Sequence, residues 1–486
     1  MNSEIRQLEP KALWNKFADL NAVPRASKKE ERVIQFIKEF GEHLGLDTSV
    51  DKVGNVIIRK PATTGLEDRK TVVMQSHLDM VHQKNNDTNF DFDKQGINMF
   101  IDGDWVKAKG TTLGADNGLG VATIMAILES NTIAHSAIEA LFTIDEETGM
   151  TGAKGLEGGL LSGDILLNLD TEEDDEIGVG CAGGVDVTAT LAYDEVETPI
   201  SSTGYKIYVK GLNGGHSGMD IHKGLGNANK IMNRLLYFGD EKFGMRISEI
   251  DGGSLRNAIP RESNAVIAID SASEAAFNTG IEALIHEIKA ELKTMEPNLN
   301  ILVSKSEAPK KVMDLKVQAV LLKAIYAACN GVYRMSADIP DLVETSNNIA
   351  RVVVKNGNVT IACLTRSSVE SSKWDLANSL KASFELAGCD VTFSGEYPGW
   401  TPNMESPILK ILSKIYTELN GKEPHVAACH AGLECGILGT NYPNMDMISF
   451  GPNIKGAHSP DERAQISSVK KYWDFVLEIL KQIPKK

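Results

Sequence analysis

The chain has 486 residues, of which 66 are acidic and 50 are basic, so its formal net charge is -16. A negative balance of this size disfavours nucleic-acid backbones and anionic membrane surfaces as main partners. The length exceeds the roughly 250–300 residues at which a single hydrophobic core stops growing, so we expect more than one domain.

The first residues, MNSEIRQLEPKALWNKF, lack the basic and apolar regions of a secretory signal, and no apolar run reaches the roughly 20 residues of a membrane helix. The six cysteines are scattered without a CxxC pair, which disfavours a disulfide framework and a structural zinc knuckle. Cys429 and Cys435 flank His430, but their apolar, helical context favours buried side chains over a metal site. We therefore expect a cytoplasmic protein with reduced thiols.

Helices and short apolar strands alternate in the first part of the chain. In chain order, the pattern predicts helices at 10–20 and 30–45, a strand at 71–77, a helix at 121–130, and strands at 137–147 and 164–170. This alternation is typical of an α/β domain with a mainly parallel sheet and helices on both faces.

The pattern changes near residue 187 and changes back near residue 398. The stretch between them runs through a similar series of elements twice, which predicts an inserted α/β domain of two similar halves. The first series is strand 204–212, helix 223–238, strands 245–252 and 264–270, helix 274–295 and strand 298–306; the second is helix 317–330, strands 349–357 and 359–365, helix 371–388 and strand 390–396.

The last part of the chain supplies a helix at 408–419, a strand at 444–451 and a final helix ending near Ile483. These elements look like the missing part of the first domain. We therefore expect one domain formed by residues 1–186 and 399–486, interrupted by an inserted domain at 187–398.

Histidine and acidic side chains stand at or just past the ends of predicted strands, or in a glycine-rich turn before a helix. They are His77 with Asp79, Asp116, Glu146 with Glu147, Asp170 and His458. The carboxyl ends of the strands form the ligand crevice of open α/β sheets, so these residues are expected to converge.

The donor types at these positions fit divalent cations. Imidazole and carboxylate ligands suit zinc and related ions, and the lack of cysteine ligands favours a catalytic over a structural site. Two ions about 3.5–4 Å apart need a bridging carboxylate and further ligands on each side, which two histidines and three carboxylates provide. Glu146 is then free to accept a proton from water.

Each of these residues also has an ordinary explanation when it is taken alone. A histidine at a strand end is usually a hydrogen-bonded residue, an acidic pair such as Glu146 and Glu147 is usually a solvated loop, and Asp116 fits a helix N-cap. The prediction of a metal site therefore depends on their joint occurrence.

Six motifs occur in order along nearly the whole chain. They are SHLDMV (76–81), TTLGADNGLGVA (111–122), DEETGMTGA (145–153), NLDTEE (168–173), GGHSGMDI (214–221) and GAHSPDER (456–463). Together they resemble the motifs of bacterial aminoacyl-histidine dipeptidases, the cytosolic non-specific dipeptidase branch of the di-zinc exopeptidases related to carboxypeptidase G and aminoacylase.

The resemblance implies two divalent metal ions, zinc first, with cobalt or manganese as alternatives. Transferred to the matching positions, it implies His77 and Asp170 on one ion, Glu147 and His458 on the other, and Asp116 between both. Metal identity stays open, because all three metals use such ligands.

The resemblance also implies catalytic residues. Glu146 would be the general base, and Asp79 would orient His77. The inserted stretch resembles the lid domain of the family, and His216 in GGHSG resembles the residue that polarises the scissile carbonyl. Without the family, His216 would be a loop histidine between glycines.

Substrate contacts are implied for three further residues. Asn257 in SLRNAIPRES and Arg366 in CLTRSS resemble contacts for the carboxylate end of the substrate, and Gly432 is a third candidate. The wider superfamily often has Gly-Gly-Thr-Asp where this chain reads HAGLE (430–434), a departure that fits the dipeptidase branch and leaves the local contacts open.

The implied function is hydrolysis of unblocked dipeptides, including Xaa-His dipeptides, through a metal-bridging water activated by Glu146. N-acylated amino acids or longer peptides are the alternative substrates. A non-catalytic metal- or peptide-binding protein is the alternative class, and Glu146 argues against it because binding alone needs no spare carboxylate beside a metal ligand. A nucleotide-directed hydrolase is disfavoured by the acidic balance and the lack of a phosphate-binding glycine loop. Both a monomer and a homodimer fit the sequence.

Overall fold

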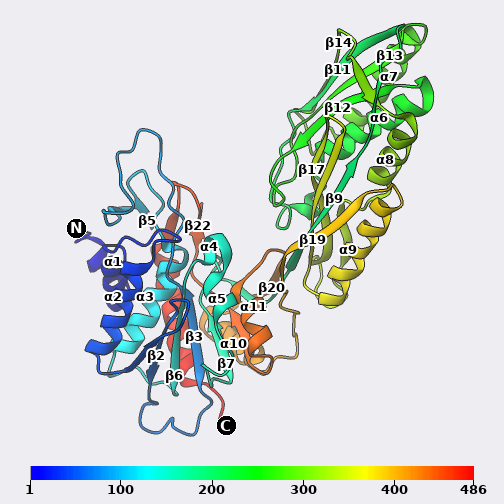
Figure 1. Cartoon of the computed structure of the whole chain (residues 1–486). Coiled ribbons are helices and arrows are strands. Elements are labelled where there is room, and N and C mark those ends of the chain that lie inside the picture. The colour runs from blue at the N-terminus through cyan, green and yellow to red at the C-terminus, as the bar shows by residue number, and fades with distance from the viewer. Residues whose placement is uncertain (1) are drawn as a thin grey trace. The chain divides into compact units, whose positions relative to one another are not determined.

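The structure, a computed structural model, describes residues 2–486 as two compact units (Figure 1). Unit 1 extends to Gly180 and resumes at Pro402–Ala428 and Leu433–Lys486. Unit 2 comprises Cys181–Thr401 and the four residues Cys429–Gly432. Within residues 2–486, no helix combines the length and apolar character needed to cross a bilayer.

Unit 1 is built on a mixed sheet of eight strands. In spatial order these are β1 (Asp47–Val50), β2 (Val56–Lys60), β6 (Ile138–Thr143), β3 (Val72–His77), β7 (Ile165–Asn168), β21 (Asp446–Ser449), β8 (Glu176–Cys181) and β20 (His425–Cys429). The central strands β6, β3, β7 and β21 run parallel, whereas β1 and β2 are antiparallel to their neighbours. The fold class expected from the sequence is thereby confirmed.

The helices of unit 1 pack against this sheet. They are α1 (Lys11–Leu20), α2 (Glu31–His43), α3 (Ala115–Glu129), α4 (Glu146–Gly149), α5 (Thr151–Gly155), α10 (Pro407–Asn420), α11 (Glu434–Asn441), α12 (Ile466–Lys481) and the short 3-10 helix η1 (Ile5–Gln7). Figure 1 shows α1, α2 and α3 on one side of the strands and α10 on the other. In α2, the buried positions Val33, Ile37 and Gly41 recur every four residues and form the face turned to the sheet.

Two expectations about these elements were wrong. The strand expected at 137–147 ends at Thr143, because Asp145 adopts a left-handed conformation with φ 50° and Glu146 begins α4. The helix expected at 121–130 begins earlier, at Ala115. The first shift moves Glu146 and Glu147 from an expected strand to the first turn of α4, whereas Asp116 lies within the bounds of α3 but keeps a non-helical backbone (φ -80°, ψ 112°).

A second, small sheet of unit 1 was not predicted. Its strands are β22 (Ile454–Lys455), β23 (Arg463–Gln465), β5 (Trp105–Ala108) and β4 (Met99–Asp102). These strands have two to four residues each, too few to give a clear alternation in the sequence.

Unit 2 contains an antiparallel nine-stranded sheet. In spatial order its strands are β14 (Asn300–Ser306), β11 (Ser202–Lys210), β13 (Ser263–Asp270), β12 (Arg246–Gly253), β17 (Val343–Lys355), β18 (Asn358–Ser367), β9 (Gly183–Ala192) and β19 (Asp390–Tyr397), with β16 (Gly331–Met335) beside β17. The other elements are α6 (Ala228–Phe243), α7 (Glu274–Leu292), α8 (Leu315–Ala327), α9 (Glu370–Glu385), the 3-10 helix η2 (Ile221–Lys223) and the strand pair β10 (Glu195–Glu197) and β15 (Lys311–Met313).

The sheet of unit 2 consists of two halves that meet at the neighbouring strands β12 and β17, and each half has four strands when it is read from that pair to the sheet edge. One half reads β12-β13-β11-β14 and carries α6 and α7, and the other reads β17-β18-β9-β19 and carries α8 and α9. Strand β9 belongs to the second half in space but precedes the whole first half in the chain. The repeat is therefore incomplete when it is read along the sequence.

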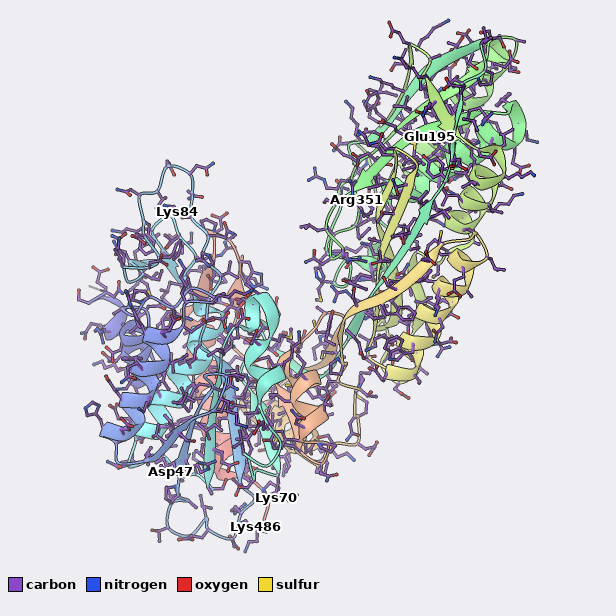
Figure 2. The ribbon with its side chains drawn as sticks, viewed as in Figure 1. Asp47, Lys70, Lys84, Glu195, Arg351 and Lys486 are labelled. Carbon is purple, nitrogen blue, oxygen red and sulfur yellow. The ribbon has the colours of Figure 1, made fainter. Side chains whose placement is uncertain are left out.

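Charged pairs join neighbouring strands in both large sheets, and one of these pairs includes an edge strand. Asp47, on edge strand β1, lies opposite Arg59 of β2 with Oδ2 and Nη1 3.2 Å apart. Figure 2 labels this aspartate together with Arg351 of β17, which lies inside the sheet of unit 2 and pairs with Asp251 of the neighbouring strand β12. Charges at sheet edges oppose edge-to-edge association.

Candidate metal centre

The carboxyl ends of the parallel strands bring the predicted ligands of unit 1 together. His77 ends β3, Glu147 follows β6 in α4, and Asp170 lies two residues beyond β7. Asp116 lies in the first turn of α3, and His458 lies in the loop between β22 and β23. Five segments that are distant in the chain thus meet at one place.

Asp116 lies between the two histidines. Its Oδ1 is 3.2 Å from His77 Nε2, and its Oδ2 is 3.2 Å from His458 Nε2. Asp170 Oδ1 is 3.6 Å from His77 Nε2, and Glu147 Oε2 is 3.0 Å from His458 Nε2. The arrangement consists of two triads of donor atoms, each within 4.8 Å, that share Asp116.

These donors fit a pair of divalent cations. Carboxylate and imidazole are ligands of zinc and related ions, and a shared carboxylate is what a dinuclear site requires. Three carboxylates gathered in a largely buried place repel one another unless positive charge lies between them. His77 is 1% exposed and His458 is 57% exposed, so the cluster opens to solvent on the side of His458.

The carboxylates draw positive charge onto both imidazoles. Burial lowers the pKa of His77, but the charge of Asp170 and the bonds to Asp116 and Asp170 outweigh it and hold that pKa well above its usual value. Hydrogen bonds to Asp116 and Glu147 raise the pKa of His458 to about 11. The Nε2 atoms of both rings point at the place where the carboxylate oxygens gather, and a cation bound there would replace the protons on these nitrogens.

Asp79 connects His77 to the start of α4. Its Oδ1 lies 3.3 Å from His77 Nδ1 and accepts a hydrogen bond from the N–H of Glu146 at 3.0 Å, while its Oδ2 accepts from the N–H of Glu147 at 3.3 Å. A carboxylate at Nδ1 fixes the orientation of the ring and leaves Nε2 for a cation.

Glu146 lies beside the two triads. Together with His77 and Glu147 it forms a further group of donor atoms within 4.8 Å. Burial raises its pKa well above the usual value, Asp170 adds to this and the charge of His77 opposes it. A carboxyl group with a raised pKa is suited to take up and release a proton near neutral pH.

Unit 2 contains the other predicted site residues. The backbone of His216 pairs with that of Ala258, and the N–H of Ser217 donates to Asn257 O at 2.8 Å, so His216 and Asn257 lie on adjacent loops. Arg366, on β18, is buried and donates from Nη1 to Tyr397 Oη at 2.6 Å. Gly432 belongs to the short segment Cys429–Gly432 of this unit.

The His216 ring is held as a neutral donor. Its Nδ1 accepts hydrogen bonds from the N–H groups of Gly218 and Met219 at 3.2 and 3.0 Å, so the ring proton is on Nε2. Burial, followed by the charge of Arg366, lowers the pKa of His216 to about 4. The imidazole is therefore neutral at physiological pH and presents an Nε2–H donor.

The cysteines beside His430 differ from expectation in one respect. Cys435 is buried in α11 as expected, but Cys429 is half-buried at the end of strand β20, with Sγ 3.5 Å from Met219 Sδ. His430 itself binds Ser346 Oγ through Nε2 at 2.8 Å.

Sequence reasoning missed three buried charged residues near the metal cluster. They are Arg25, Glu434 and Glu462, all less than 3% exposed. Glu462 could have been recognised from the sequence because it lies in the GAHSPDER motif. Nothing in the sequence around Arg25 indicates that it lies near the site. Glu434 accepts hydrogen bonds from Gln75 Nε2 and Thr143 Oγ1, each at 2.6 Å, beneath the ends of β3 and β6.

Comparisons with known proteins cover the whole chain. Residues 73–482 match Peptidase family M20/M25/M40. The "Cytosol non-specific dipeptidase" of Escherichia coli (strain K12) is 44% identical over 484 residues, 100% of each chain. The crystal structure of aminoacylhistidine dipeptidase from Vibrio alginolyticus is 44% identical, with a TM-score of 0.94 over 100% of this chain and 99% of that one. A tripeptidase structure from Staphylococcus aureus shares the fold at 18% identity, with a TM-score of 0.57 over 98% of this chain and 99% of that one.

Proposed function

Because the chain belongs to peptidase family M20/M25/M40, a family of peptide-bond hydrolases, we propose that it is a metal-dependent dipeptidase. The observation that carries the proposal is the pair of donor triads that share Asp116, with Glu146 beside them. The full-length identity of 44% to two proteins named as dipeptidases supports dipeptides as the substrate class.

Five residues of unit 1 would hold two divalent cations, zinc first, with cobalt and manganese as alternatives. His77 and Asp170 are assigned to one ion, Glu147 and His458 to the other, and Asp116 to both. Bound there, the ions would supply Lewis acidity and make a water molecule easier to deprotonate.

Glu146 is assigned the transfer of protons. It takes a proton from the attacking water and delivers it to the leaving amine, a role supported by its raised pKa and its place beside both triads. Asp79 is a positioning residue, because it touches His77 and holds the backbone of Glu146 rather than the reacting atoms.

Unit 2 is assigned the recognition of the substrate, as the lid of the enzyme. The neutral Nε2–H of His216 is suited to donate to the oxygen of the scissile carbonyl. Arg366, with Asn257 and Gly432, is assigned to the free carboxylate of the dipeptide, for which a guanidinium is the matching partner.

Metal analysis and a substrate panel test this proposal. We expect the purified protein to bind two divalent ions, to lose dipeptidase activity on chelation and to regain it when zinc, cobalt or manganese is returned. Xaa-His dipeptides such as β-alanyl-histidine should be hydrolysed faster than acetylated amino acids or tripeptides. A protein that binds no divalent ion, or that prefers acylated amino acids, contradicts the proposal.

Substitution of His216 tests the role of unit 2. We expect His216→Ala to keep both metal ions and to lose about 10²–10³ in kcat, the usual cost of removing one donor to a developing oxyanion. Steady-state kinetics and metal content are the measurements, and His222→Ala, an exposed histidine of the same unit, is the matched control. Turnover close to that of wild type in His216→Ala rules out this role.

A further inference from the structure

The backbone before Asp116 forms a nest of four successive N–H groups around one side chain. Glu462 Oε2 accepts from the N–H groups of Leu113 and Gly114 at 2.7 and 2.9 Å, and its Oε1 accepts from those of Ala115 and Asp116 at 2.7 and 3.2 Å. Gly114 has the left-handed conformation (φ 70°, ψ 32°) that curls such a segment around an anion. The two oxygens of a carboxylate offer about four lone-pair sites for hydrogen bonds, and here four backbone N–H groups donate to them.

Glu462 lies on the loop that carries His458. This loop is closed by its own hydrogen bonds: the N–H of Glu462 donates to Ser459 O at 3.0 Å, and Ser459 Oγ donates to Gly456 O at 2.7 Å. The glutamate therefore ties the segment bearing His458 to the turn bearing Asp116, two segments that are far apart in the chain.

Arg25 donates a hydrogen bond to a backbone carbonyl group of the same turn. Its Nη2 donates to Gly114 O at 2.5 Å, and its Nη1 donates to Leu78 O and Asp79 O at 3.1 and 3.0 Å. Leu78 directly follows His77, so Arg25 connects the turn before Asp116 to the segment after His77. The left-handed backbone of Gly114 favours glycine, and a Cβ there would lie 2.5 Å from Arg25 Nη2, so a side chain would also push against this guanidinium.

Together, these contacts cross-link three segments that carry predicted ligands. We propose that Glu462 and Arg25 are positioning residues that hold His77, Asp116 and His458 in the geometry for metal binding before any cation is bound. The inference rests on the proposed function, because it takes these three side chains to be metal ligands. Preorganisation lowers the ordering cost that a cation would otherwise have to overcome on binding.

A comparison of two buried glutamates tests the proposal. Glu462→Gln places an amide NH2 against two backbone N–H donors, so the turn should be displaced. Glu139→Gln is the matched control: Glu139 is buried and accepts from the N–H groups of Ser162 and Gly163 at 2.8 and 3.0 Å, but it lies near the start of β6, away from the carboxyl ends of the strands. Both substitutions remove a buried carboxylate that holds a turn.

The measured quantity is the affinity of the metal-free protein for Zn²⁺. We expect Glu462→Gln to weaken it roughly 10- to 100-fold, as is usual when a residue that supports metal ligands is lost, and Glu139→Gln to leave it unchanged even if it unfolds at a lower temperature. Glu462→Gln that binds two ions with the wild-type affinity overturns the inference. Equal losses of affinity in both variants also overturn it, because the effect is then one of general stability.

If Glu462→Gln does not fold, amide hydrogen exchange of the wild-type protein tests the inference instead. We expect the amides of residues 113–116 to be protected in the metal-free protein, because their acceptor is a side chain and not an ion. Exchange as fast as that of unstructured chain, with protection only after Zn²⁺ is added, overturns the inference. A wild-type protein that binds no Zn²⁺ at all contradicts the proposed function instead, whatever the exchange rates are.

Discussion

Replacing Glu146 by glutamine is expected to lower kcat by about 10²–10⁴, because an amide of the same shape cannot take up the proton of the attacking water. The two metal ions should stay bound, since the five assigned ligands are unchanged. Steady-state kinetics on a dipeptide and metal content per chain are the two measurements.

The metal content separates two roles for this residue. Glu146 also has the spacing of a metal ligand with His77 and Glu147, so a variant that loses an ion would make it a ligand and not a base. Glu157→Gln is the control, because Glu157 is an exposed carboxylate of the same unit, paired with Lys52 at 2.6 Å. Nearly unchanged kcat in Glu146→Gln, with both ions bound, contradicts the assigned mechanism.

Replacing Asp116 by asparagine is expected to abolish the dinuclear site. The amide keeps one oxygen but turns an NH2 donor toward one of the two imidazoles that Asp116 now contacts at 3.2 Å. The loss of metal affinity should exceed the roughly 10–100-fold typical of a residue that only supports ligands, and activity should fall with it.

Titration of the metal-free variant with Zn²⁺ measures this effect. We expect fewer than two ions per chain at concentrations that saturate wild type. Asp461→Asn is the control, because Asp461 is an exposed acid on the loop that carries His458. Two ions bound with the wild-type affinity in Asp116→Asn show that this carboxylate is not shared between them.

The sequence located part of the elements of the two large sheets. Strand β3 and helix α10 are within one residue of the expected bounds, whereas β1, β2, β8, β9 and β20 were not predicted. The strands of the small sheet, β4, β5, β22 and β23, were missed because they are too short. The repeat of unit 2 was visible only in part, since β9 is separated from its own half by the entire other half.

By itself, the sequence determined which residue types stand at the ends of the strands, and the topology rule for parallel sheets was enough to predict that they converge. The tertiary structure decided that Asp116 lies between His77 and His458, and that Glu462 and Arg25 hold the turn before it. The physical reason is that a strand end is a local feature of the chain, readable from apolar periodicity. A hydrogen bond across about 350 residues depends on how the whole chain packs.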